Sequence, residues 1–159
     1  MRSVLPAVLA AAIAALLTPD RAAGQLRDLR VLTSAAATKA VAAAEAEARR
    51  NNWNVSIAVV DAAGELVAFL RMDGASPSSV DIAPAKARTA ARFRRPTKAM
   101  EEAVAGGRTV LLSFPDVTPV EGGVPVIVNG QVVGAVGVSG VTSPQDAQVA
   151  QAGASAVAP

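Results

Sequence analysis

Six basic side chains lie close together in the middle of the chain with no acidic residue among them: Lys86, Arg88, Arg92, Arg94, Arg95 and Lys98. Arg88, Arg92 and Arg95 are spaced i, i+4 and i+7, which places them on one stripe of a helix. Such a stripe predicts a surface that binds carboxylates, such as haem propionates or a small organic acid. The alternatives are a solvated helix face, or ion pairs with Glu101, Glu102 or a neighbouring subunit.

Lys86 differs from the other basic residues because its neighbours Ala83, Ala85 and Ala87 are small. Its side chain would therefore cross a tightly packed surface. There it could pair with a ligand carboxylate or, if desolvated, act as a base. The alternative is a lysine whose stem lies along an apolar surface while its ammonium reaches water.

Glycine-containing loops form a second candidate site. Glu121-Gly122-Gly123 precedes an apolar run that starts at Val124, and Gly140 follows Ser139 at the end of another run. If the two runs pair, these loops meet at one end of a sheet. Backbone N–H groups there, with the N-terminus of a helix starting at Ser143, could bind an anion. Ordinary turn formation is the alternative.

The chain has 159 residues, a formal net charge of +2, and no cysteine, histidine or tyrosine. This composition excludes disulfides, thiol chemistry, a histidine base and imidazole, thiolate or phenolate metal ligands. Haem iron is usually held by His, Cys, Met or Tyr. Met72 or Met100 would be the remaining candidates, or the protein ligand is weak or absent; core filling is the other interpretation of both. The small net charge argues against nucleic-acid binding.

The N-terminus has the pattern of a secretion signal. Arg2 precedes the apolar run Val4–Leu17, and the small residues Ala22-Ala23-Gly24 follow. We therefore predict a signal peptide over 1–24, a single domain over 25–159, and a periplasmic or secreted protein. The apolar run is about 14 residues, short of the ~20 that a spanning helix needs. A retained membrane anchor is the alternative.

Two predicted β-hairpins organise the domain. Asp61–Gly64 is a short turn, and Asn129-Gly130 is the strongest two-residue signal for a type I′ turn. Gly134 and Gly137 fall on opposite faces of the last strand, so we expect close neighbours on both sides of it. The predicted strands are Val55–Val60, Leu66–Leu70, Val124–Val128 and Gln131–Ser139.

Helices are predicted on either side of these hairpins. Thr97 and Ser143 are the expected N-caps of the last two helices, and Pro84 requires a place in the first turn of its helix. The order α-β-β-α-α-(β)-β-β-α predicts an α+β fold, a sheet with helical cover. The small side chains favour a site at the surface or between subunits. The predicted helices are Ser34–Arg50, Asp81–Phe93, Thr97–Val104 and Ser143–Val157, with a possible strand over Thr109–Phe114.

Several blocks of this sequence resemble the GlcG/HbpS-like family, in the family's order. They are VSIAVVDAAGELVAFLRMDGA, the pattern S-x-x-x-A-x-x-K-A-x-T-A-A-R-F, GGVPVIVNGQVVGAVGVSG and QDAQVAQAG. The resemblance covers about residues 32–157. The family is described as a haem-binding or haem-degrading domain, and it also occurs fused to corrinoid adenosyltransferases.

The resemblance implies a profilin-like α/β/α layered fold around an antiparallel sheet. It also implies homo-oligomers, often octamers, that bind haem or another small molecule at exposed or intersubunit surfaces. Histidine is a suspected haem ligand in some members, and that role cannot transfer to a chain without histidine. Carried over by motif, and joined by Arg92 from the basic stripe, the candidate ligand-binding residues are Arg71, Asp73, Lys86, Thr89, Glu121, Gly122, Gly123, Ser139 and Gly140.

These observations lead to one expected function and two alternatives. The expected function is an exported, oligomeric binding protein for haem or a similar small anionic ligand, without histidine ligation. The first alternative is an enzyme or sensor for a small carboxylic acid, acting at an intersubunit site with Lys86 and the loop Glu121–Gly123. The second is a structural or accessory oligomer that binds no ligand. No metal ligand set and no catalytic residue is predicted.

Overall fold

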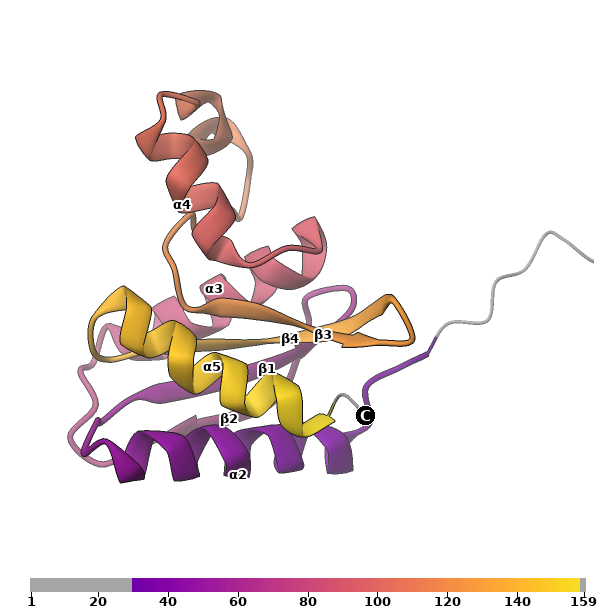
Figure 1. Ribbon diagram of the computed structural model, residues 1–159, viewed down its shortest axis with the longest axis vertical. Helices are drawn as coiled ribbons and strands as arrows, with labels where there is room; N and C mark the ends of the chain where they lie inside the picture. Colours follow the sequence, from indigo (N-terminus) through magenta and orange to yellow (C-terminus); the bar gives the residue numbers. More distant parts are fainter. Residues whose placement is uncertain (1–29, 158–159) are drawn as a thin grey trace, which may run out of the picture.

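The computed structural model describes residues 30–157, and the predicted signal peptide lies outside them. Its centre is a four-stranded sheet in the order β2-β1-β4-β3, in which every neighbouring pair is antiparallel (Figure 1). Both predicted hairpins are therefore confirmed, and they join through β1 and β4. The strands are β1 (Ser56–Asp61), β2 (Leu66–Arg71), β3 (Gly123–Val128) and β4 (Gln131–Ser139).

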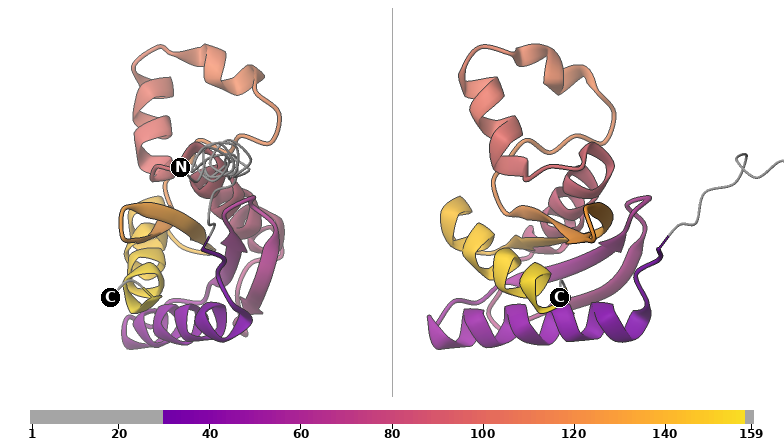
Figure 2. Two further views of the ribbon diagram at one scale, coloured as in Figure 1. Left: turned by 90° about the vertical axis from the view of Figure 1, so that its right-hand side faces the viewer. Right: turned by 45° about the vertical axis from the view of Figure 1, so that its right-hand side comes forward.

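Helices cover both faces of the sheet. α2 and α5 pack on one face and α3 packs on the other, as the views in Figure 2 also show. The α+β class and the α/β/α layers are thus confirmed. The helices are α2 (Ser34–Arg50), α3 (Ser79–Phe93), α4 (Thr97–Ala105) and α5 (Ser143–Val157), with a 3-10 helix η1 (Thr109–Ser113) after α4.

Local sequence signals account for the hairpin turns and for the first helix. Asn129 and Gly130 both have positive φ, at 50° and 74°, as a type I′ turn requires. In the first hairpin, the carboxylate of Asp61 accepts hydrogen bonds from the backbone N–H groups of Ala63 and Glu65. The side chain of Thr33 accepts a hydrogen bond from the N–H of Ala36 and so caps α2.

The two layers of the core differ in the size of their side chains. Between the sheet and α2 with α5, branched residues such as Ile57, Val59 and Val136 are buried. Between the sheet and α3, the buried cluster is mostly alanine, together with Val60. α3 therefore lies much closer to the sheet than a layer of large side chains would allow.

Glycines in β3 and β4 make this close approach possible. A Cβ atom placed on Gly137 would lie 2.1 Å from the carbonyl oxygen of Ala83 in α3, and one on Gly123 would lie 2.4 Å from that of Lys86. On the opposite face, a Cβ on Gly134 would lie 3.1 Å from Cδ2 of Leu32. The prediction of close neighbours on both faces of β4 is confirmed.

One predicted element is wrong. The segment Thr109–Phe114 forms η1 and not a strand, so the order has no strand between α4 and the second hairpin. Its Val and Leu residues favour a strand locally, but a strand needs a neighbour to pair with. The segment instead lies beside α4, and only Leu111 in η1 is buried.

The start of α3 and the N-caps of α4 and α5 also differ from the prediction. α3 begins at Ser79, so Pro84 is its sixth residue and lies beyond the first turn. Thr97 does not cap α4; its hydroxyl is buried and accepts a hydrogen bond from the N–H of Gly123 at 2.9 Å. At α5, the N–H of Asp146 bonds to the carbonyl of Thr142, which moves the cap one residue before Ser143.

Residues 97–122 form an arm that projects away from the three layers (Figures 1 and 2). It contains α4, η1 and the chain that returns to β3. The rings of Phe93 and Phe114 stack with a centroid separation of 6.2 Å, which joins η1 to the end of α3. Large apolar side chains remain exposed on the arm, with Val110 at 58% and Leu112 at 59%. This surface has the character of a contact surface.

The close approach of α3 to β4 can be tested by adding one methyl group. We expect Gly137→Ala to lower the free energy of unfolding by about 1–3 kcal/mol, because the new Cβ meets backbone atoms of α3 that cannot move separately. Gly106→Ala is the control, since its Cβ would lie 3.3 Å from the nearest atom and its φ is −77°. Urea unfolding of the three proteins measures the difference; equal stability of both variants would contradict the packing described.

Candidate functional site

Lys86 and Asp146 form a buried ion pair at the centre of the predicted site. Nζ of Lys86 donates to Oδ2 of Asp146 at 2.8 Å, and the two side chains are only 2% and 3% exposed. Lys86 comes from α3 and Asp146 from the first turn of α5. The pair therefore connects the helices on opposite faces of the sheet.

The loop before β3 closes over this ion pair. A Cβ on Gly122 would lie 2.7 Å from Nζ of Lys86 and 3.0 Å from Cβ of Asp146, and φ of Gly122 is +129°. The carbonyl of Gly122 accepts a hydrogen bond from the N–H of Val138 at 2.9 Å. Only a residue without a side chain fits here. The glycine loop therefore covers the ion pair, and this close packing explains why residue 122 is a glycine.

Asp146 was not predicted from the sequence. Asp146 is the first residue of a buried stripe on α5. The stripe has the spacing i, i+3, i+4, i+7 and i+8, and its members are Asp146, Val149, Ala150, Gly153 and Ala154. A carboxylate on the apolar stripe of a helix requires a partner. That pattern was the available signal, but it does not say which cation lies opposite.

Burial raises the pKa of Asp146, while Lys86 and the N–H of Val141, which donates to Oδ1 at 3.2 Å, act in the opposite direction. The net rise means that the pairing does not fully offset the loss of hydration, as is common for buried ion pairs. Oδ1 thus occupies one backbone N–H group, that of Val141, in the region between β4 and α5 where an external anion was expected. The carboxylate of Asp146 thus takes the place of the predicted ligand.

The glycine loops meet as predicted. Gly122 lies beside Val138 in β4, and Gly140 follows at the end of the same strand. Ser139 pairs with Ser56 in β1, and Ser56 pairs with Arg71 in β2, so these residues form one row across the end of the sheet. A Cβ on Gly140 would lie 2.4 Å from a backbone oxygen, so Gly140 also serves close packing.

Other predicted residues are held by their own partners. Arg71 donates to the carbonyl of Ala75 at 2.9 Å, and Asp73 is exposed in the loop after β2. The hydroxyl of Thr89 accepts a hydrogen bond from the N–H of Thr118 and so holds the returning chain of the arm. None of these contacts brings Arg71, Asp73 or Thr89 to the ion pair.

The basic stripe divides into two groups. Arg92 donates to the carbonyl of Ala63 at 2.8 Å and forms ion pairs with Glu65 and Asp116. α3 ends at Phe93, and Arg94 follows in the left-handed conformation with φ of 53°. Arg95 therefore leaves the helical stripe, and the predicted single face of Arg88, Arg92 and Arg95 is wrong.

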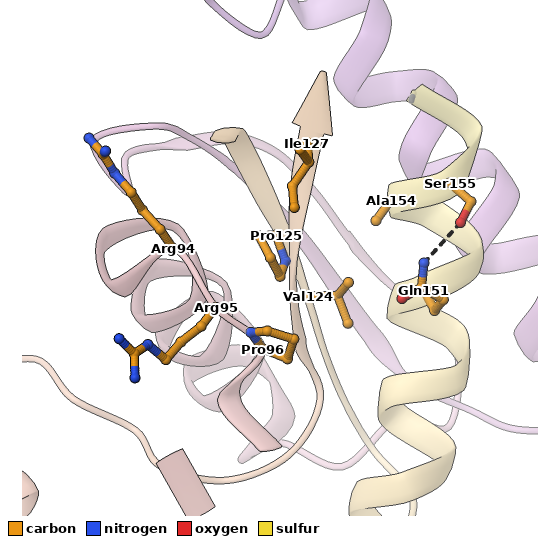
Figure 3. A pocket seen from close by; sticks show the side chains of 9 residues that line it. All are labelled: Arg94, Arg95, Pro96, Val124, Pro125, Ile127, Gln151, Ala154 and Ser155. Carbon is orange, nitrogen blue, oxygen red and sulfur yellow. Dashed lines mark hydrogen bonds between the residues drawn. The ribbon is translucent and has the colours of Figure 1, made fainter. Parts of the chain in front are cut away.

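Arg94 and Arg95 instead flank a groove at the open edge of β3, which we call the edge groove (Figure 3). Its volume is about 330 Å³. Figure 3 shows β3 between the two arginines on one side and α5 on the other, with the arginine side chains extended away from α5. The lining residues are Arg94, Arg95, Pro96, Val124, Pro125, Ile127, Gln151, Ala154 and Ser155.

Two further hollows adjoin the edge groove. One of about 520 Å³ shares Arg94 and Ile127 with it and lies over the two hairpin turns. The other, of about 220 Å³, is lined by Glu121, Gly122 and Gly123 together with Lys98. Glu121 raises the pKa of Lys98, to which it is hydrogen bonded at 3.2 Å, so these two charges compensate each other. Arg94 and Arg95, which form no ion pair within residues 30–157, line the edge groove, and Arg94 also lines the larger hollow.

Among residues 30–157, no three Asp or Glu side chains gather closely enough to hold a metal ion. Within the same range, no helix combines the length and apolar character needed to cross a bilayer.

The chain matches the family described as "Haem degrading protein HbpS-like" over residues 32–155. This match covers most of the chain, so the protein belongs to the HbpS-like family. The Escherichia coli (strain K12) protein GlcG is 52% identical over 109 residues, which cover 69% of this chain and 81% of GlcG. The predicted family is therefore confirmed.

Solved structures agree with this assignment. A double mutant of Streptomyces reticuli HbpS is 39% identical, with a TM-score of 0.77 over 83% of this chain and 90% of HbpS. A complex of PduOC with haem is 27% identical, with a TM-score of 0.72 over 80% of this chain and 95% of PduOC. The profilin-like α+β fold implied by the sequence is confirmed by these structures.

The ion pair can be tested with a double-mutant cycle. We expect Lys86→Met and Asp146→Asn each to lower the free energy of unfolding by about 3–5 kcal/mol, because each leaves a buried charge without its partner. The double variant should recover most of this loss, since neither charge remains and the new amide oxygen at position 146 still accepts from the N–H of Val141.

The pair of Lys98 and Glu121, in which Lys98 is 55% exposed and Glu121 is 13% exposed, supplies the control. Lys98→Met with Glu121→Gln should change the unfolding free energy by less than about 1 kcal/mol. Chemical denaturation at neutral pH measures all variants. Additive losses in the Lys86 and Asp146 double variant would refute the coupling.

Proposed function

We propose that this protein is a homo-oligomeric binding protein for haem or a similar anionic ring compound, which it holds at the edge groove. The single observation that carries this proposal is the position of Arg94 and Arg95 beside an apolar groove at an open sheet edge. Haem combines a flat apolar ring with two carboxylates. The groove offers the matching combination of apolar surface and guanidinium groups.

The apolar part of the groove is suited to contact with a ring. Val124, Pro125 and Ile127 come from β3, and Ala154 comes from α5. Ile127 is 47% exposed, so its side chain is available for contact with a ligand. A ring on this surface would cover Ile127 and extend toward the larger hollow that shares it.

The cations that flank the groove have few partners of their own. Arg95 makes one long contact, in which its Nε donates to the carbonyl of Phe93 at 3.4 Å. Within residues 30–157, the guanidinium of Arg94 makes no ion pair or hydrogen bond. Arg92, by contrast, is neutralised by Glu65 and Asp116. Arg94 and Arg95 are therefore the arginines of the run best placed to bind carboxylates.

The groove fits the ring and the carboxylates of haem but offers no usual ligand for its iron. None of its lining residues is His, Cys, Tyr or Met. Met72 is buried in the core below α2, and Met100 is buried in the arm. The proposal is therefore one of binding through the ring and its carboxylates, without an imidazole ligand, and it includes no haem-degrading step.

The relatives support a haem-related role. The family description names haem, and PduOC, which is 27% identical, has been solved as a haem complex. Those statements concern the family and PduOC. For this chain, the family description and the PduOC complex make haem the first of the flat anionic ligands to test.

The first alternative, an enzyme or sensor that binds a small carboxylic acid with Lys86 and the loop Glu121–Gly123, has less support. It requires the ammonium of Lys86 to face a ligand, yet that group is buried and paired with Asp146. The loop itself covers the pair. A ligand carboxylate would have to displace both Gly122 and Asp146.

Hemin titration tests the proposed function. We expect a saturable change in the Soret band with the wild-type protein, and binding about tenfold weaker in Arg94→Ala/Arg95→Ala, because two carboxylate contacts are lost. Arg49→Ala/Arg50→Ala removes the same charge from the end of α2 and should bind as the wild type does. Spectra identical to hemin in buffer, or equal weakening in both double variants, would exclude this site.

Export and self-association are further parts of the proposal. The pattern of Arg2, Val4–Leu17 and Ala22–Gly24 supports a signal peptide and a periplasmic or secreted location. The exposed apolar residues of the arm, Val110 and Leu112, support a contact with other copies.

Mass spectrometry of the protein isolated from its natural host tests export and self-association together. Under denaturing conditions we expect the mass of a subunit that begins near Gln25, and under native conditions a multiple of that mass. A subunit that keeps Met1–Gly24 would contradict cleavage. A native mass equal to one subunit at all concentrations would contradict self-association.

A further inference from the structure

The arm contains a pocket that the edge groove does not include, which we call the arm pocket. It lies between the end of α3, one face of α4 and η1, and its volume is about 270 Å³. Its apolar surface includes Phe93, Met100, Leu111 and Phe114. Met100 is 3% exposed and Leu111 is 9% exposed, so this surface is the small core of the arm.

Two arginines complete the lining of the arm pocket. Arg95 enters it from the connection between α3 and α4, and Arg108 enters it from the residue before η1. Both are exposed. Within residues 30–157, Arg108 makes no side-chain ion pair or hydrogen bond, and Arg95 makes only its long contact with Phe93.

The acidic residues of the arm do not neutralise these arginines. Glu102 pairs with Lys98 at 3.6 Å, and the carboxylate of Glu101 accepts a hydrogen bond from the N–H of Glu121. No Asp or Glu is among the residues that line the pocket. The arm pocket thus joins an apolar, aromatic interior to two guanidinium groups with no counter-charge in the lining.

We propose that the arm pocket binds a small aromatic carboxylate, with its ring among Phe93, Phe114 and Met100 and its carboxylate at Arg95 and Arg108. Aromatic rings and a thioether make favourable contacts with a flat ring. A guanidinium binds a carboxylate through two parallel hydrogen bonds. The volume lies just below the range of about 300–1000 Å³ typical for drug-sized ligands, which favours a single ring with a short acidic group.

This inference does not depend on haem binding. The arm pocket and the edge groove share Arg95, but Arg108 lines only the arm pocket and Arg94 lines only the edge groove and its larger neighbour. Arg108→Ala and Arg94→Ala therefore separate the two sites. Arg95 lies between them and is left unchanged in the test.

The test uses the methionine methyl groups as reporters in the full domain. Met72 and Met100 are the methionines after Met1, and only Met100 lines the arm pocket. With ¹³C-methyl methionine labelling, a benzoate titration at constant pH and ionic strength should shift the Met100 signal saturably through the ring current. The Met72 signal should stay in place, since Met72 lies in the core below α2. Met100→Leu assigns the signals.

Matched ligands and variants make the outcome decisive. Benzamide has the same ring without the charge, and Arg108→Ala removes one guanidinium; each should weaken binding about tenfold or more. Arg94→Ala should bind benzoate as the wild type does. An unchanged Met72 signal shows that each variant is folded.

Several results would overturn the proposal. These are the absence of a saturable Met100 shift with benzoate, equal binding of benzamide, or undiminished binding by Arg108→Ala. A Met100 signal that responds to protein concentration but not to benzoate would also overturn it, because a second copy of the chain would then fill the pocket.

Discussion

The close contact between α3 and the sheet is the constraint on which the rest of the structure depends. Gly123 and Gly137 let the backbone of α3 approach β3 and β4, and the layer between them contains little more than alanine methyl groups. Lys86 lies on the inner face of this helix and is almost completely buried. Its charge must therefore find a partner inside the protein, and Asp146 of α5 provides it.

The same contact decides where a ligand can bind. Alanine methyl groups fill the space beneath α3, and the edge groove and the arm pocket lie outside that layer, along β3 and in the arm. The end of α3 at Arg94 then separates the basic residues. Arg92 stays on the helix and pairs with Glu65 and Asp116, while Arg94 and Arg95 follow the end of the helix and line the edge groove. The end of α3 therefore divides basic residues that are continuous in the sequence. Arg92 has a structural role, whereas Arg94 and Arg95 belong to the proposed binding groove.

Most of the fold could be predicted because its turns, strands and helices depend on residues that are close together in the sequence. The hairpin turns at Asp61–Gly64 and Asn129-Gly130 are both of this kind. The error at Thr109–Phe114 has the same origin, since a short run of Val and Leu favours a strand whether or not a neighbouring strand exists. The site was harder to predict, because Lys86 and Asp146 are 60 residues apart and nothing local links them.

The sequence by itself determined the family, the antiparallel hairpins and the chemistry that is excluded, because a chain without His, Cys or Tyr lacks those groups in any conformation. It also singled out Lys86 and the glycines around it. Only the tertiary structure decided that Lys86 forms an ion pair with Asp146, and that Arg94 and Arg95 line a groove at the surface. The reason is physical: a side chain's type fixes its possible partners, but its burial and the distance to each partner depend on how separate elements pack.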